Sequence, residues 1–182
     1  MIITHLQPFL FRLCLGLLVL PLPAWASGIS ESEAALKTAF VYNFTQFITW
    51  PVAPANTPFR LCVLSAKREL REQFNRLNGK TANHRVIKLV FLHRDFTTTE
   101  LQSCQLVFQP KPSPPVLSKP LPRGVVLVAY NPKPNNPNVS ISMQSSRARL
   151  LRFSINQAAV AVAGVKISSQ LLKLAINKQE TH

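Results

Sequence analysis

Acidic residues and glycines are scarce in this chain. Of its 182 residues, seven are Asp or Glu, against 21 Lys or Arg, and only five are Gly. So few glycines exclude a Gly-rich phosphate-binding loop. The scattered carboxylates do not form the acid–base pair of a glycoside hydrolase, and no Gly-x-Ser-x-Gly nucleophile motif occurs. The sequence therefore predicts a protein that is not an enzyme and needs no cofactor.

The chain's only aspartate stands close to a histidine. His93 and Asp95 share one predicted loop, a spacing that could suggest a catalytic dyad. A solvated surface pair is the interpretation we favour, because no nucleophile motif accompanies it. No His cluster accompanies the cysteines either, so a zinc site is not expected.

Long apolar runs are missing except near the N-terminus. Arg12 is the only Lys or Arg before an apolar run at Leu13–Leu22, and Ala24-Trp25-Ala26 matches a small-x-small cleavage site. We predict a signal peptide over residues 1–26, cleaved between Ala26 and Ser27, and an exported domain over residues 27–182. The alternative is a membrane span, but the run is short for one and is interrupted by proline.

Cysteine is rare, and its count changes with cleavage. Cys14 lies in the apolar run, so the exported chain keeps two cysteines, Cys62 and Cys104. An even, well-separated pair in an oxidising compartment predicts a disulfide. Two free buried thiols are the alternative.

The chain carries a large excess of basic over acidic residues. The formal net charge is +14, and removing Arg12 with the signal peptide lowers it by one, to +13. Such a charge favours anionic surfaces, including membrane headgroups and acidic patches on proteins. Nucleic acid is not expected as a partner, because the chain carries an export signal and its basic residues are not interleaved with aromatics.

Hydrophobic periodicity predicts a single-domain α/β fold with a mixed, mainly parallel sheet of about six strands and helices packed on it. A helix from a Ser30–Glu33 capping box to Pro51 comes first, and the strand–helix–strand order that follows predicts a parallel crossover. Strands are expected over 59–64, 85–92, 105–108, 124–130, 139–143 and 148–155, and further helices over 68–77, near 98–101, and after caps at Asn156 and Ser168, with a Gly164 stop.

Several residues in these elements are candidate contacts. Trp50 is interpreted first as a lid on the core, and as a partner contact if it is exposed. Arg147 and Arg149, at the solvated end of the last hairpin, are further candidate contacts. Asn43 is expected to be a hydrogen-bonded polar group in the core. The Pro-rich segment 110–122 should be extended, as an interface or as a stiff tether.

Two blocks of sequence resemble a known family. Residues 39–51 read AFVYNFTQFITWP and are followed by Leu-Cys-Val-Leu at 61–64. Residues 153–175 read Phe-x-Ile-Asn, then small residues and Gly, then Ile-Ser-Ser-x-Leu-Leu-x-Leu-Ala. In this order, with Cys62 and Cys104 between the two motifs, they resemble the terminal signatures of the YfiR-like periplasmic proteins.

The resemblance implies a periplasmic protein that represses an inner-membrane diguanylate cyclase by contacting the periplasmic region of that enzyme. It would lower cyclic di-GMP signalling and biofilm formation, and relatives suggest a homodimer. The alternative function is a binding module for a small anionic molecule or a wall fragment at the ends of the parallel strands. A hydrolase is a third class, for which the sequence shows no active-site pair.

Overall fold

A computed structural model describes residues 28–51, 53–54, 56–64, 66–93, 95–111, 121–134, 136–146 and 150–176, with side chains from Glu33 onward. The described helices are α1 (Gly28–Phe47), α2 (Arg68–Asn75), α3 (Thr98–Gln102), α4 (Gln157–Ala163) and α5 (Ser169–Leu174). The described strands are β1 (Ile48–Thr49), β2 (Phe59–Leu64), β3 (Thr81–Ala82), β4 (Arg85–Leu92), β5 (Leu106–Gln109), β6 (Val126–Tyr130), β7 (Ile141–Ser145), β8 (Leu151–Ile155) and β9 (Lys166–Ile167).

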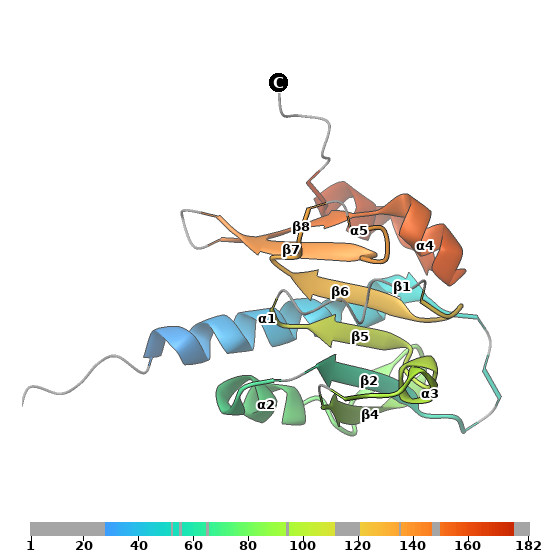
Figure 1. The fold of residues 1–182 in the computed structure, drawn as a ribbon, viewed down its shortest axis with the longest axis horizontal. Helices are drawn as coiled ribbons and strands as arrows, with labels where there is room; N and C mark the ends of the chain where they lie inside the picture. Colours follow the sequence, from blue (N-terminus) through green and yellow to red (C-terminus); the bar gives the residue numbers. More distant parts are fainter. Residues whose placement is uncertain are drawn as a thin grey trace, which may run out of the picture.

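The main sheet has seven strands in the order β3-β4-β2-β5-β6-β7-β8 (Figure 1). Its five central strands, β4-β2-β5-β6-β7, are parallel. The edge strands β3 and β8 are antiparallel to their neighbours. This confirms the predicted α/β fold with a mixed, mainly parallel sheet. The additional strand is the short β3, and a separate two-stranded sheet joins β1 to β9.

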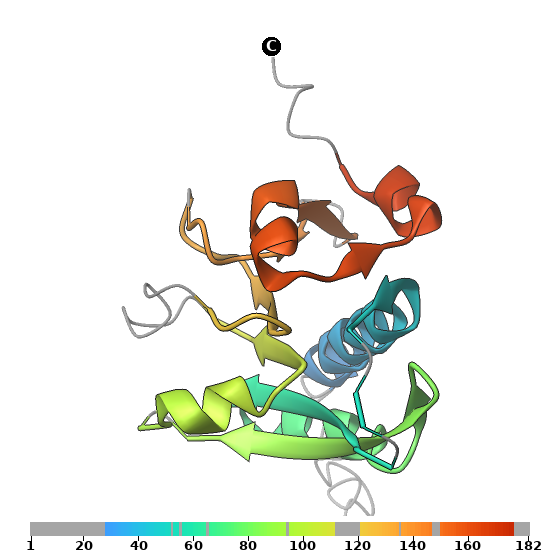
Figure 2. The same cartoon turned by 90° about the vertical axis from the view of Figure 1, so that its right-hand side faces the viewer.

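The larger core cluster lies between the sheet and the helices α1 and α2. In Figure 2 the sheet curves around α1. Phe74 of α2 stacks on Phe108 of β5 with ring centroids 5.3 Å apart, and Phe44 of α1 meets Phe153 of β8 at 5.1 Å. Each such buried side chain contributes about 1.5–3 kcal/mol through the hydrophobic effect. A smaller cluster on the opposite face includes Leu101 of α3.

The buried face of α1 differs from the predicted one. Asn43 is exposed, so its assignment to the core was wrong, and Leu36 is 39% exposed. Thr38 and Thr45 are buried instead, since their hydroxyls donate to backbone oxygens one turn earlier, at Ala34 (2.9 Å) and Tyr42 (2.6 Å) respectively. A threonine that satisfies its hydroxyl on its own helix can face the core.

The caps predicted for the C-terminal helices are present, whereas the predicted start of the first helix was wrong. The first helix begins at Gly28 rather than after a cap at Ser30. At the other end, Asn156 accepts a hydrogen bond from the Ala159 amide, Gly164 is left-handed with a φ of 69°, and Ser168 caps α5. These three predictions are confirmed.

Some expectations concern residues outside the described part. The predicted signal peptide, residues 1–26, lies there, as does most of the Pro-rich segment, residues 112–120. In the part of the chain that the structure describes, no helix is long and apolar enough to cross a membrane.

Candidate functional site

The carboxyl ends of β2, β5 and β6 lie at one edge of the sheet, where the first half of α1 extends past them (Figure 1). The chain leaves β2 toward β4 on one side and leaves β5 toward β6 on the other. Open α/β sheets bind ligands where the connections diverge in this way. A pocket of about 340 Å³ opens here, lined by Glu33, Ala34, Lys37, Lys67, Glu69, Leu70, Pro110 and Lys111.

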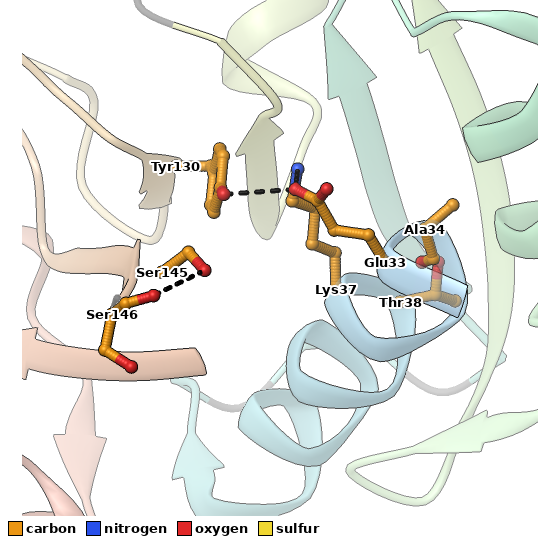
Figure 3. Close-up of polar contacts among 7 residues, drawn as sticks. All are labelled: Glu33, Ala34, Lys37, Thr38, Tyr130, Ser145 and Ser146. Carbon is orange, nitrogen blue, oxygen red and sulfur yellow. Dashed lines mark hydrogen bonds and ion pairs between the residues drawn. The ribbon is translucent and has the colours of Figure 1, made fainter. Parts of the chain in front are cut away.

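Three side chains form a polar cluster at this edge (Figure 3). Glu33 and Lys37 lie one turn apart on α1, and the Lys37 Nζ is 2.6 Å from the Glu33 Oε1. Tyr130, the last residue of β6, donates its hydroxyl to the same oxygen at 3.0 Å. The Lys37 ammonium also lies 3.5 Å from the centroid of the Tyr130 ring, a cation–π contact.

The cluster separates the two acid groups in proton affinity. The hydrogen bond from Lys37 and its positive charge, with the Tyr130 hydroxyl, lower the pKa of Glu33, although burial opposes them. Burial, and then the hydrogen bond to Glu33, raises the pKa of Tyr130. At neutral pH the carboxyl is therefore ionised and the phenol protonated. The arrangement offers fixed charges and hydrogen-bonding groups rather than a proton-transfer pair.

The sequence-predicted contact residues do not gather at this edge. Trp50 is only 7% exposed, and its indole N–H donates to the backbone oxygens of Gln105 (3.1 Å) and Gly124 (3.0 Å). Trp50 was expected to contact a partner only if it were exposed. It is buried, and it covers the core. Arg147 and Arg149 lie outside the described residues.

The predicted disulfide is present. Cys62 of β2 is bonded to Cys104, just before β5, with Cα atoms 5.9 Å apart. Both side chains are buried in the smaller core cluster. The bridge therefore joins β2 to the segment that leads into its parallel neighbour β5, on the face opposite α1.

The candidate dyad lies at the surface. His93 Nδ1 and Asp95 Oδ2 are 3.9 Å apart, and their side chains are 91% and 94% exposed. Among the described residues, no group of three or more His, Cys, Asp or Glu side chains could hold a metal ion.

Sequence reasoning missed the cluster at the carboxyl edge. It assigned Glu33 to a capping box and did not single out Lys37 or Tyr130. The i, i+4 spacing of Glu33 and Lys37 was a usable signal for an ion pair on one helix face. Tyr130 lies 97 residues from Glu33, so only the strand order brings them together.

Fold and site together define a single-domain α/β protein whose mixed sheet carries a buried cross-link and a charged pocket at its carboxyl edge. The family model described as YfiR/HmsC-like matches residues 34–176, and the chain belongs to this family. No curated protein matches it. Membership implies, in general terms, a periplasmic regulator of a diguanylate cyclase rather than an enzyme. Nothing in the family match or the described residues supports the expected homodimer or membrane contact.

Proposed function

We propose that this protein represses an inner-membrane diguanylate cyclase by binding its periplasmic region, which lowers cyclic di-GMP and biofilm formation. The family match over residues 34–176 is the observation that carries the proposal. The predicted signal peptide at residues 1–26 agrees with it. A regulator without chemistry of its own acts by differential affinity, so this protein must bind the inactive state of the cyclase more tightly than the active state.

The carboxyl edge is the surface that we assign to this contact. Lys67 and Lys111 are exposed at the rim of its pocket, and neither has a carboxylate within 4.0 Å in the described part of the chain. Unpaired rim cations attract a partner surface of opposite charge and accelerate its association. We therefore expect an acidic patch on the periplasmic region of the cyclase.

Gene deletion with complementation tests the proposal. Deletion should raise cyclic di-GMP and biofilm, and the wild-type gene should restore both. A Lys67→Glu/Lys111→Glu variant should restore them poorly, because it reverses the rim charge. The matched control, Lys88→Glu/Lys173→Glu, makes the same charge change at exposed positions on β4 and α5 and should complement fully. Unchanged cyclic di-GMP after deletion, with no cyclase co-purifying, would contradict the function.

A further inference from the structure

A second cavity lies at the opposite, amino edge of the sheet. It has a volume of about 440 Å³ and lies where the chain enters β5 and β6, beside the end of α4. Its lining combines two arginines with mainly apolar groups: Trp50, Pro51, Ala53, Arg85, Gln105, Arg123, Gly124 and Ala163. Neither the family match nor the proposed contact at the carboxyl edge accounts for it.

Arg85 carries a partly buried charge that no acid in the described ranges neutralises. Its Nε donates to the Thr57 oxygen at 2.8 Å, and its Nη2 donates to the Pro58 oxygen at 2.7 Å and lies 3.5 Å from Gln105 Oε1. All three acceptors are neutral. Among the described residues, no carboxylate lies within 4.0 Å of the guanidinium and none accepts a hydrogen bond from Nη1.

Arg123 brings a second guanidinium to the same cavity. Its Nη2 lies 3.2 Å from the position that a Cβ would take on Gly164, so the side chain lies along the end of α4. The neighbouring amide of Gly124 donates to the Ala163 oxygen at 2.7 Å and holds this wall in place. In the described part of the chain, the Arg123 guanidinium likewise has no carboxylate within 4.0 Å.

Trp50 makes the cavity a preformed one. Its indole N–H joins the backbone oxygens of Gln105 and Gly124, the residues that lead into β5 and β6. The side chain of Gln105 contacts Arg85, and Gly124 follows Arg123 in the chain. The same hydrogen bonds therefore tie together the backbone segments that lead into β5 and β6, and Pro51 and Ala163 add apolar surface to the lining.

We propose that this cavity binds the oxyanion group, phosphate or carboxylate, of a small organic molecule between the guanidiniums of Arg85 and Arg123. The planar guanidinium donates paired hydrogen bonds to such anions. The apolar walls would contact the rest of the ligand. The cavity volume of about 440 Å³ falls in the roughly 300–1,000 Å³ range of organic ligand sites. The site is independent of the proposed cyclase contact.

The test measures binding by the whole exported chain, residues 27–182, using calorimetry and thermal shift at constant ionic strength. The probes are inorganic phosphate, phenyl phosphate and benzoate. We expect saturable one-to-one binding, with phenyl phosphate tighter than inorganic phosphate because of the apolar walls. Comparing phenyl phosphate with benzoate distinguishes a phosphate from a carboxylate ligand. In the exported chain, predicted to begin at Ser27, Trp50 is the only indole, so its fluorescence should change on binding.

Arginine variants decide between this site and general attraction to a basic protein. Arg123→Gln should weaken binding by about tenfold to a hundredfold, the effect of losing a charged hydrogen-bond donor. Arg152→Gln removes the same charge from an exposed position on β8 and should bind as the wild type does. Arg123→Lys keeps the charge but loses the paired donors, so it should fall between the two.

Two results would overturn the proposal. One is equal affinity of the Arg123→Gln and Arg152→Gln proteins for every probe, which would show attraction by net charge alone. The other is the absence of saturable binding by the wild type. Both results are obtained without the cyclase, so they leave the proposed repression untouched. Conversely, failure of complementation leaves this binding site standing.

Discussion

At the scale of single residues, the Glu33 carboxylate has two stabilising contacts. It pairs with the Lys37 ammonium and accepts a hydrogen bond from the Tyr130 hydroxyl. A carboxyl whose pKa is lowered by folding stabilises the protein above its unfolded pKa. That stabilisation is lost as the pH falls through the folded pKa. For Glu33 the loss should occur below its ordinary value of 4.5.

Tyr130→Phe should remove part of this stabilisation. Without the hydroxyl the pKa of Glu33 rises toward its ordinary value, and the free energy of unfolding at neutral pH falls by about 0.5–1 kcal/mol. Screening keeps the effect small, since the Glu33 side chain is 50% exposed. Urea unfolding at neutral and at acid pH measures it, and the difference from the wild type should shrink in acid. Tyr42→Phe is the control, because the Tyr42 hydroxyl donates to the neutral Thr81 oxygen and not to a carboxylate; identical pH profiles for both variants would contradict the prediction.

Residue-scale features were predictable where the chemistry is local. The disulfide between Cys62 and Cys104 was predicted from the even number of cysteines in a chain expected in an oxidising compartment. The caps at Asn156 and Ser168 were predicted from residue type. The exposure of Asn43 was not predictable, because apolar spacing favoured Leu36 over the threonines for the buried face. Threonine hydroxyls that bond to their own helix are counted as polar in a pattern, although they can be buried.

At the scale of elements, the turn between β3 and β4 completes the end of α1. Asn83 and His84 form this turn, and both have left-handed φ values, 50° and 58°. The Asn83 amide donates to the oxygens of Thr45 and Ile48, each at 2.8 Å. Helix ends leave such carbonyls without intrahelical partners, so the turn that follows β3 supplies a cap for α1.

Two glycine substitutions in this turn should have opposite effects. Asn83→Gly keeps a residue suited to positive φ but loses both cap hydrogen bonds, which should lower the free energy of unfolding by about 1–3 kcal/mol. His84→Gly relieves a left-handed conformation and should raise it by up to about 1 kcal/mol. Denaturant midpoints followed by circular dichroism compare them. If Asn83→Gly proved as stable as His84→Gly, the side-chain cap would have no energetic role.

Long elements were predictable and short ones were not. The strands β2 and β4 are six and eight residues long and mostly apolar, which is enough to show a pattern. The strands β1, β3 and β9 have two residues each, too few for any periodicity. Their pairing depends on partners far away in the chain, so the pairing of β1 with β9 could not be predicted from local sequence.

At the scale of the whole molecule, the disulfide connects two cysteines that are separated by 42 positions in the chain. Replacing both Cys62 and Cys104 by Ala should lower the free energy of unfolding by about 4 kcal/mol in the chain-entropy treatment. Guanidinium unfolding with and without reductant checks this. Reductant should bring the wild type close to the variant and leave the variant unchanged. A wild type that is insensitive to reductant throughout its unfolding would contradict a stabilising bridge.

The architecture could be predicted at the level of class but not of arrangement. The strand–helix–strand order of residues 59–92 indicates a parallel sheet on general rules of connection. The strand order places Tyr130 beside Glu33, and the register brings Arg85 and Arg123 to one cavity. These juxtapositions join positions far apart in the chain, so neither site could be found from spacing alone.

The pairing of β1 with β9, in which Ile48 lies opposite Ile167, has a consequence for biosynthesis. When the chain is exported from its predicted N-terminal signal peptide onward, α1 reaches the periplasm well before β9, the strand that docks against its end. Until then the apolar stripe of Val41, Phe44 and Ile48 lacks part of its cover, and unfinished chains with exposed apolar surface aggregate readily. Stable docking of α1 therefore has to wait until residues 166–167 have followed, and chains that stop before residue 166 should depend on chaperones.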